Sequence, residues 1–300
     1  MFAQTKMDAA SRAAEKELEK LRMTVIVRQR QEYRRALDEL RGLMSELYGK
    51  YAKEGVLTYS QMTQYNRLKS LYANIKEITS GLYDWEKKQI PMLINDSFKE
   101  AYFRYGYTFQ AGGLDLNWGV LNPATIKAAT DIPISGLPVS DILTKNNYNF
   151  YLKARQEVTQ GLIQGESIDE MSKRIQSVTE VDAGKAELVA RTESTRAAGQ
   201  GHVAAYDRAE KLGVEIDRIW IAMLDRRTRD AHAELDGQKA DEEGLFHIDG
   251  FSADAPGGFG DAAMDCNCRC TIIAEVKDFP SVALEGYEEM TYDKWVEQYR

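Results

Sequence analysis

Residues 33–51 read YRRALDELRGLMSELYGKY, and this stretch decides the fold. Its apolar side chains recur at steps of three and four residues, the spacing that gathers them on one face of an α-helix. The row is made by Leu37, Leu40, Met44, Leu47 and Tyr51. Tyr33 and Ile26 extend it towards the N-terminus by sevens, as in a coiled-coil seam. The pattern predicts one long helix from about Asp8 to Tyr51.

A second apolar row follows the turn signal Lys53-Glu54-Gly55. It consists of Leu68, Leu71, Ile75, Ile78, Leu82 and Trp85. Two such rows joined by a short turn predict an antiparallel helical hairpin or a coiled-coil arm. For the second helix, packing against an ordinary helical core is an equal alternative. After Pro91, the aromatic residues Phe98, Tyr102 and Tyr105 indicate a third amphipathic segment that packs on the hairpin.

Residues 111–140 differ in composition from what precedes them and predict a hinge or domain boundary. They contain the turn-forming residues Gly112, Gly113, Gly119, Pro123, Pro133, Gly136 and Pro138. Within the hinge, Asn122-Pro123 is typical of a helix start, because an N-cap is followed by proline at the first helical position.

Three further helices are expected after the hinge. The first covers residues 141–163, and the capping box Ser167-Ile168-Asp169-Glu170 opens a short second one. Asp182 is expected to cap a long third helix that ends at Leu212-Gly213.

Beyond Gly213 the pattern changes from helix to strand. β-branched and aromatic residues predict strands at 215–224, 245–248 and 268–276. Between the first two, a turn leads into a short helix that ends before Gly237. The Gly- and Pro-rich residues 249–265 are expected to form a long surface loop.

The predicted fold class is α+β, mostly α, in three parts: a helical arm at 1–110, a hinge or linker at 111–140, and a helical and small mixed β module at 141–300. Residues 1–110 carry 19 Lys and Arg against 14 Asp and Glu, a net charge of +5. Residues 111–300 carry 20 against 33, a net of −13. The total of −8 therefore conceals two unlike surfaces. Because the basic excess of the arm is modest, we expect it to bind protein rather than DNA.

The sequence lacks the segments that would direct it to a membrane or out of the cell. No apolar window is long enough for a membrane span, and the N-terminus has no apolar signal-peptide segment, so we expect a soluble, non-exported protein. The three cysteines lie within five residues, which excludes a disulfide framework spread through the fold.

The sharpest cluster of reactive residue types is formed by His232, Asp225, Cys266, Cys268 and Cys270. Thiolates, an imidazole and a carboxylate are the ligands of tetrahedral zinc sites, but the spacing is not a standard one. Free thiols beside a buried histidine are therefore the favoured interpretation, and no cofactor is expected. A zinc site and a local disulfide, joining Cys270 to Cys266 or to Cys268, stay open as alternatives.

Enzyme motifs are incomplete. Residues 191–196, RTESTR, contain the residue types of ADP-ribosyltransferase sites, but those enzymes place them on separate strands, whereas one helix is predicted here. The sequence has no phosphate-binding glycine loop and no Gly-x-Ser-x-Gly elbow. His202 and His247 are expected to be structural. We therefore expect that the protein is not an enzyme.

Residues 140–276 present a series of short motifs in a defined order. The series is Gly161–Ser167, Ala190-Arg191-Thr192-Glu193, Trp220-Ile221, Asp225–Arg229, His232, Leu235-Asp236-Gly237-Gln238, Phe246, Pro256 and Asn267-Cys268-Arg269-Cys270. This order and spacing resembles the phage Mu F-like head morphogenesis family, the minor capsid proteins of tailed bacteriophages and prophages.

The resemblance implies a minor procapsid component that is present in few copies, is associated with the portal vertex and acts in head assembly, DNA packaging or genome delivery. Family members are not generally catalytic. Some carry a toxin domain behind the module, for which little chain follows the Cys-Arg-Cys strand here. The implied partners are portal protein and capsid or scaffolding protein, with packaged double-stranded DNA as a further candidate and no membrane. The implied location is the virion, in the head interior or at the portal vertex, and the bacterial cytoplasm during assembly.

The family positions carried over to this chain are Arg191, Glu193, Asp225, Arg227, Thr228, Arg229, His232, Gly237, Cys268 and Cys270. We expect all of them except His232 and the two cysteines to form a structural network that links the long helix to the short helix and the strand. Cys266 and the loop Gly257-Gly258-Phe259-Gly260 depart from the family pattern. Two alternative functions stay open: a metal-dependent hydrolase or nuclease centred on His232 and the cysteines, and a DNA-escort protein ejected with the genome.

Overall fold

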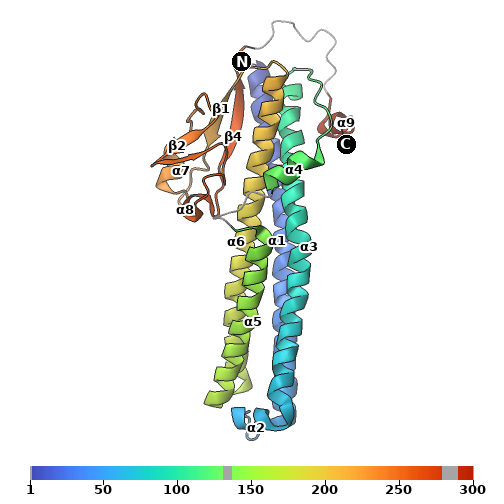
Figure 1. Cartoon of the computed structure of the whole chain (residues 1–300), viewed down its shortest axis with the longest axis vertical. Helices are drawn as coiled ribbons and strands as arrows, with labels where there is room; N and C mark the ends of the chain where they lie inside the picture. The colour runs from blue at the N-terminus through green and yellow to red at the C-terminus, as the bar shows by residue number, and fades with distance from the viewer. Residues whose placement is uncertain (1, 131–136, 279–289, 300) are drawn as a thin grey trace. The chain divides into compact units, whose positions relative to one another are not determined.

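The computed structural model describes residues 2–130, 137–278 and 290–299. Pro133 and Gly136 of the predicted hinge lie outside these ranges. The helices are α1 Phe2–Tyr51, α2 Tyr59–Thr63, the 3-10 helix η1 Gln64–Asn66, α3 Arg67–Ala111, α4 Pro123–Thr130, α5 Val139–Gln164, α6 Ile168–Lys211, α7 Asp230–Glu234, α8 Ala262–Asp265 and α9 Tyr292–Val296 (Figure 1). The strands are β1 Ile216–Ile221, β2 Phe246–Ile248, β3 Phe251–Ala253 and β4 Thr271–Val276. The predicted fold class, α+β and mostly α, is confirmed.

The chain forms two compact units, each assembled from separated segments. Unit 1 comprises Met1–Met23, Met92–Pro138 and Ala190–Arg300. Unit 2 comprises Thr24–Pro91 and Val139–Val189. Each unit therefore combines residues of the predicted arm with residues of the predicted C-terminal module.

Unit 2 is built around an apolar helical core. Its buried side chains come from four helices: Tyr33, Leu40, Met44 and Tyr48 of α1, Leu71, Ile75 and Leu82 of α3, Phe150, Ala154, Val158 and Leu162 of α5, and Met171, Ile175 and Ala186 of α6. The predicted hairpin of α1 and α3 is present, and both of its apolar rows face this shared core. The rows thus serve an ordinary helical core, which was the alternative to a coiled-coil arm.

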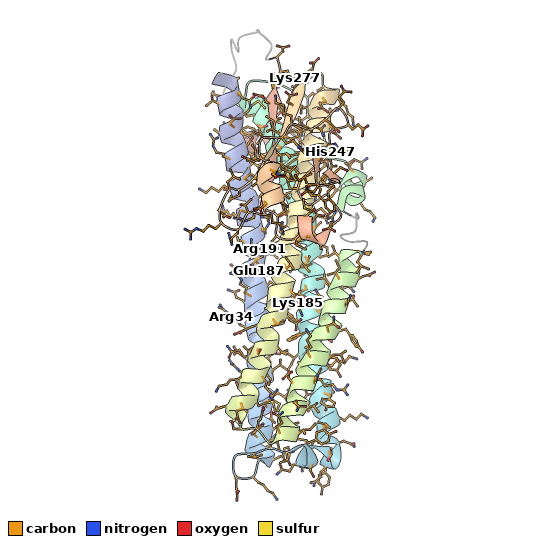
Figure 2. The ribbon with its side chains drawn as sticks, turned by 90° about the vertical axis from the view of Figure 1, so that its left-hand side faces the viewer. Arg34, Lys185, Glu187, Arg191, His247 and Lys277 are labelled. Carbon is orange, nitrogen blue, oxygen red and sulfur yellow. The ribbon has the colours of Figure 1, made fainter. Side chains whose placement is uncertain are left out.

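Short turns with local caps connect the helices of unit 2. Thr58 forms a capping box with Gln61 at the start of α2. The predicted capping box at the start of α6 is confirmed, because the Ser167 N–H donates to Glu170 at 2.8 Å and the Ser167 hydroxyl accepts from the Glu170 N–H. Along the helices, Arg30 donates two hydrogen bonds of 2.8 Å to Glu187, which Figure 2 labels on α6.

Two predicted helix boundaries are wrong. Pro91 lies inside α3, so the segment with Phe98 continues the second helix instead of starting a third one. Proline costs one backbone hydrogen bond, and the helix absorbs this loss. Asp182 lies inside α6 rather than at a cap, because its buried carboxylate accepts from Lys185 one turn further on.

Unit 1 contains two antiparallel strand pairs. β1 pairs with β4 from Ile216 opposite Val276 to Ile221 opposite Thr271, and the two strands lie side by side in Figure 1. β2 pairs with β3 through the two-residue turn Asp249-Gly250, in which both residues have positive φ. The residues 249–265, predicted to be one long loop, therefore hold a strand and the helix α8. The Asp-Gly pair is a strong hairpin signal that the sequence interpretation overlooked.

The start of α4 agrees with the prediction. The Ala124 N–H donates to the Asn122 side chain at 2.9 Å, and Pro123 is the first helical residue. Close helix packing in unit 1 depends on small residues, since a Cβ atom on Gly201 of α6 would overlap the backbone of Phe98 on α3.

Candidate functional site

The candidate site of unit 1 lies where the chain enters β4. Cys266, Cys268 and Cys270 come just before this strand rather than inside it, because the chain turns at Asn267, which has a φ of 55°. Helix α6 holds the segment in place: the Thr195 hydroxyl donates to the Cys268 carbonyl at 3.4 Å, and the Asn267 N–H donates to the Thr192 hydroxyl at 3.3 Å. The site is thus built on a long helix.

His232 brings the short helix α7 to two of the cysteines. Its Nδ1 atom lies 3.3 Å from the sulfur of Cys270 and 3.5 Å from the sulfur of Cys268. All three side chains are buried, with exposed fractions of 3% for His232, 4% for Cys268 and 8% for Cys270. Cys266 is only partly buried and does not belong to this cluster. Asp225, the remaining candidate ligand, points elsewhere.

The two thiols differ in acidity. Hydrogen bonding with Cys268 lowers the pKa of Cys270, and the contact with His232 adds to this effect while burial opposes it. The hydrogen bond to Cys270 and burial raise the pKa of Cys268 well above its usual value. The pair therefore favours one thiolate, at Cys270, beside the imidazole.

Arg229 closes the other side of the imidazole. Its Nη1 atom lies 3.3 Å from His232 Nε2 and donates to the Met264 carbonyl at 3.1 Å. Its Nη2 atom donates to the Cys266 carbonyl. Since a guanidinium only donates, Nε2 accepts in this arrangement and Nδ1 carries the proton towards Cys270. Arg229 therefore fixes the histidine tautomer and the backbone around the cysteines.

Asp225 forms a separate surface pair with Arg269, the residue between the two buried cysteines. The two hydrogen bonds measure 2.6 and 2.7 Å, and Asp225 also accepts from the Arg227 N–H at 2.8 Å. Hydrogen bonding with Arg269 lowers the pKa of Asp225. The Thr228 hydroxyl accepts from the Asp225 N–H at 3.0 Å and donates to the Met223 carbonyl. The role of Arg269 was not predicted, although the Cys-Arg-Cys motif contains it.

The remaining members of the predicted network lie in other places. Arg191 of α6 lies 3.6 Å from Glu19 of α1, and Figure 2 shows where it sits on its helix. Glu193 is fully buried and pairs with Arg196 on the same helix at 2.9 Å. Gly237 has a φ of 78° and donates its N–H to the Trp220 carbonyl at 2.8 Å. The structure does not unite these residues with Asp225 and Arg229; they form separate local contacts.

Burial limits the chemistry of the site. A hydrolase or nuclease needs its metal-bound water or nucleophile within reach of a substrate, whereas His232 and the two cysteines are almost fully enclosed. Residues 191–196 lie on the single helix α6, and four of the six have exposed fractions of 3% or less. This arrangement differs from the separate strands of an ADP-ribosyltransferase site.

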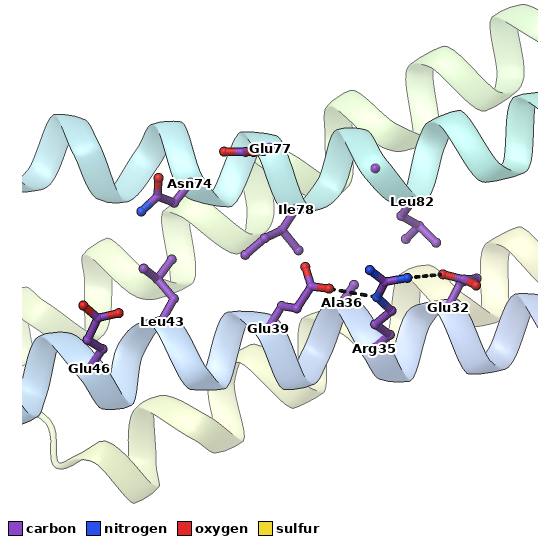
Figure 3. A pocket seen from close by; sticks show the side chains of 11 residues that line it. Glu32, Arg35, Ala36, Glu39, Leu43, Glu46, Asn74, Glu77, Ile78 and Leu82 are labelled. Carbon is purple, nitrogen blue, oxygen red and sulfur yellow. Dashed lines mark hydrogen bonds and ion pairs between the residues drawn. The ribbon is translucent and has the colours of Figure 1, made fainter.

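A second feature, on unit 2, is a groove between α1 and α3 (Figure 3). Its volume is about 480 Å³. Apolar residues Ala36, Leu43, Ile78 and Leu82 line it together with Gly81, and its polar lining is Glu32, Arg35, Glu39, Glu46, Asn74 and Glu77. Four glutamates thus stand against one arginine, which already pairs with Glu39 at 2.9 Å. Sequence reasoning missed this groove, because Ile78 and Leu82 were assigned to an apolar row that packs inside the hairpin or the core.

Among the helices of the described residues, none is long and apolar enough to cross a lipid bilayer.

Comparison with known proteins gives consistent matches. The family model described as phage Mu protein F like protein matches residues 153–273. The chain is 31% identical over 249 residues to the minor head protein GP7 of Bacillus phage SPP1. This alignment covers 82% of this chain and 80% of that protein. It is also 30% identical over 271 residues to the NAD(+)–arginine ADP-ribosyltransferase EFV of Enterococcus faecalis, covering 88% of this chain and 55% of that protein. An uncharacterized protein of Haemophilus influenzae is 26% identical over 187 residues, covering 59% of this chain and 38% of that protein. No solved structure matches the chain.

Proposed function

Because the chain belongs to the family of phage Mu protein F-like proteins, it acts in phage head morphogenesis, and we propose that it does so as a minor head protein that docks on the portal protein. The observation that carries the family assignment is the 31% identity to GP7 across 80% of that minor head protein. The groove between α1 and α3 is the surface that we assign to docking.

The shape and lining of the groove support a helical ligand. Leu43 and Ile78 are half-buried and leave apolar surface at its floor, while Gly81 contributes no side chain. A groove with an apolar floor between two helices is suited to the apolar face of a third helix. We infer that the occupant is an amphipathic helix of the portal protein.

The charge of the rim predicts the chemistry of that helix. Glu39, Glu46 and Glu77 are exposed along the groove, and the salt bridge of Glu46 with Lys50 lies at its edge. Complementary charge steers association and disfavours wrong partners. The docking helix should therefore carry Lys or Arg beside its apolar face. The basic excess of residues 1–110 does not lie at this groove. The glutamates of the groove would repel a DNA backbone.

Enzymatic activity is not part of the proposal. The name of the E. faecalis relative describes a protein of which this chain matches 55%. Arg196 and Glu193, the buried charges of the RTESTR string, pair with each other inside α6. Their burial supports a structural role within this chain.

Filling the groove tests the proposal. In Gly81→Leu the new side chain enters open space, since a Cβ atom there meets no other atom within 4 Å. The change also replaces a helical glycine by a better helix former, so the fold should be retained. We expect portal protein recovered with the tagged full chain from procapsids to fall by about tenfold or more, as for loss of a central interface contact.

The matched control is Gly42→Leu, which also lies on a helix of unit 2, has open space around it and does not line the groove. It should bind portal protein as the unaltered chain does. Point substitutions are preferable to removal of residues 1–110, because those residues contribute to both units. Unchanged portal recovery with Gly81→Leu would exclude the groove as the docking surface. Absence of the chain from purified heads would exclude the function as a whole.

A further inference from the structure

We propose that His232, Cys268 and Cys270 bind one Zn²⁺ ion through Nδ1 and the two sulfurs. An imidazole and two thiolates form a soft ligand set that suits zinc better than magnesium or calcium. The proposal concerns unit 1 and does not depend on the docking function of unit 2.

The distances already match two edges of a tetrahedral site. With Zn–N of about 2.0 Å and Zn–S of about 2.3 Å, a nitrogen and a sulfur ligand lie about 3.5 Å apart. The Nδ1 atom of His232 lies 3.3 Å from one sulfur and 3.5 Å from the other. All three ligand atoms lie within 4.8 Å of one another. An ion therefore requires only small side-chain adjustments.

The local backbone presents both sulfurs to one point. In an extended segment alternate residues face the same side, so Cys268 and Cys270 turn inwards while Arg269 turns outwards to Asp225. The Cys270 N–H lies 3.4 Å from the Cys268 sulfur and donates to it. Backbone donors to sulfur and an anchored ligand segment are the outer contacts that orient metal ligands.

Arg229 is the charged side chain next to the proposed ion, and its contact with His232 limits which tautomer of the imidazole can bind metal. Two thiolates cancel the charge of Zn²⁺, so the ion adds no net charge beside the guanidinium. With Nδ1 bound to metal, the imidazole proton moves to Nε2, which faces Nη1 at 3.3 Å. The guanidinium then retains its bonds to the carbonyls of Met264 and Cys266 but loses its bond to the ring. Zinc binding thus switches the tautomer of His232.

A metal would add a cross-link to a part of unit 1 whose sheets are small. Among the described residues each sheet has two strands, and isolated strand pairs are marginally stable. The ion would join α7 to the start of β4, across residues far apart in the chain. Small modules with little core frequently rely on such a metal.

The test measures metal in the full chain purified under reducing conditions. We expect about one zinc per chain by mass spectrometry, and the zinc-free chain should take up Co²⁺ with a thiolate-to-cobalt absorption band. Cys268→Ser and Cys270→Ser should each lose most of the zinc and reduce that band. Cys266→Ser is the matched control, because its thiol lies outside the cluster, and it should retain both.

Circular dichroism distinguishes metal loss from unfolding, since the serine variants should retain the helical signal of the unaltered chain. Thiol titration in denaturant, on chain purified without reductant, should count three free cysteines. A chain with neither bound zinc nor a cobalt band would overturn the proposal, and so would a Cys268–Cys270 disulfide, which leaves only one free thiol. Equal zinc loss in Cys266→Ser would overturn the ligand assignment.

Discussion

Each of the two units buries an ionisable group whose pKa is shifted by burial, and the two shifts have opposite signs. In unit 2, Glu86 is 3% exposed and accepts a hydrogen bond of 3.0 Å from Gln29, and burial raises its pKa to about 7. In unit 1, His202 is 3% exposed, stacks on Tyr105 with ring centroids 3.8 Å apart, and burial lowers its pKa to about 3. Neither ring nitrogen of His202 makes a hydrogen bond within the described part of the chain. Desolvation thus favours the neutral form of both groups, so the contributions of Glu86 and His202 to stability change with pH in opposite directions.

The largest expected effects are the pH dependences of these two contributions. Between its unfolded value of about 4.5 and its folded value of about 7, Glu86 binds more protons when folded, so unit 2 loses stability as pH rises through that window, by about 3 kcal/mol. Between about 3 and 6.5, His202 binds fewer protons when folded, so its own contribution to the stability of unit 1 falls as pH falls, by about 5 kcal/mol. The carboxyls of Glu15, Glu193, Asp254 and Asp265 in unit 1, whose pKa values burial raises, act in the opposite direction. Hydrogen exchange resolved by segment measures both. Glu86→Gln should flatten the response of unit 2 alone, and an unchanged response of unit 2 in this variant would contradict the contribution assigned to Glu86.

The second effect concerns the core of unit 1. Trp220 is fully buried, and its ring lies 5.2 Å from that of Phe246 and 5.7 Å from that of Phe259. Trp220→Ala should lower the free energy of unfolding by about 4 kcal/mol, since a large aromatic cavity costs about 3–5 kcal/mol. Exchange of the amides in β1 and β4 should accelerate most. If the helices of unit 2 lost protection to the same extent, the units would not respond separately.

The smallest effect compares two helical glycines. Gly201 of unit 1 faces the backbone of Phe98 and the Cβ of Ala101, whereas Gly81 of unit 2 faces open space. Gly201→Ala should destabilise the chain by about 2 kcal/mol through overpacking. Gly81→Ala should stabilise it by about 1 kcal/mol through helix propensity. Urea denaturation measures both changes, and equal signs would contradict the difference in packing.

The sequence reveals unit 2 more readily than unit 1 for a physical reason. The row of Leu40 and Met44 repeats one packing rule over many turns, so spacing alone predicts the helix. Pro91 and Asp182 misled the prediction, because local signals for helix ends were overridden by a helix that is stabilised along its whole length. The shared core with α5 was undetectable by spacing, since a core-facing row looks the same whichever helix it meets.

The site of unit 1 depends on long-range contacts that no local pattern encodes. The grouping of His232 with Cys268 and Cys270 was among the predicted ligand sets, because thiols and imidazole share a chemistry. The pairing of Asp225 with Arg269 was not predicted, since it depends on which face of the Cys-Arg-Cys segment turns outwards. Asp265 was missed as well: it is buried and accepts from the N–H groups of Phe259 and Gly260, in a segment whose glycines suggested a loose loop.

The division of unit 1 into three separated segments has a consequence for synthesis on the ribosome. Met7, Ala14 and Leu18 are buried in the finished protein, yet the segment Ala190–Arg300 that completes their unit is translated much later. At about 5–20 residues per second, the delay is on the order of ten seconds or more. During that time the apolar side chains of the N-terminal segment lack the partners that bury them in the finished protein, so their burial can only follow synthesis of the C-terminal segment.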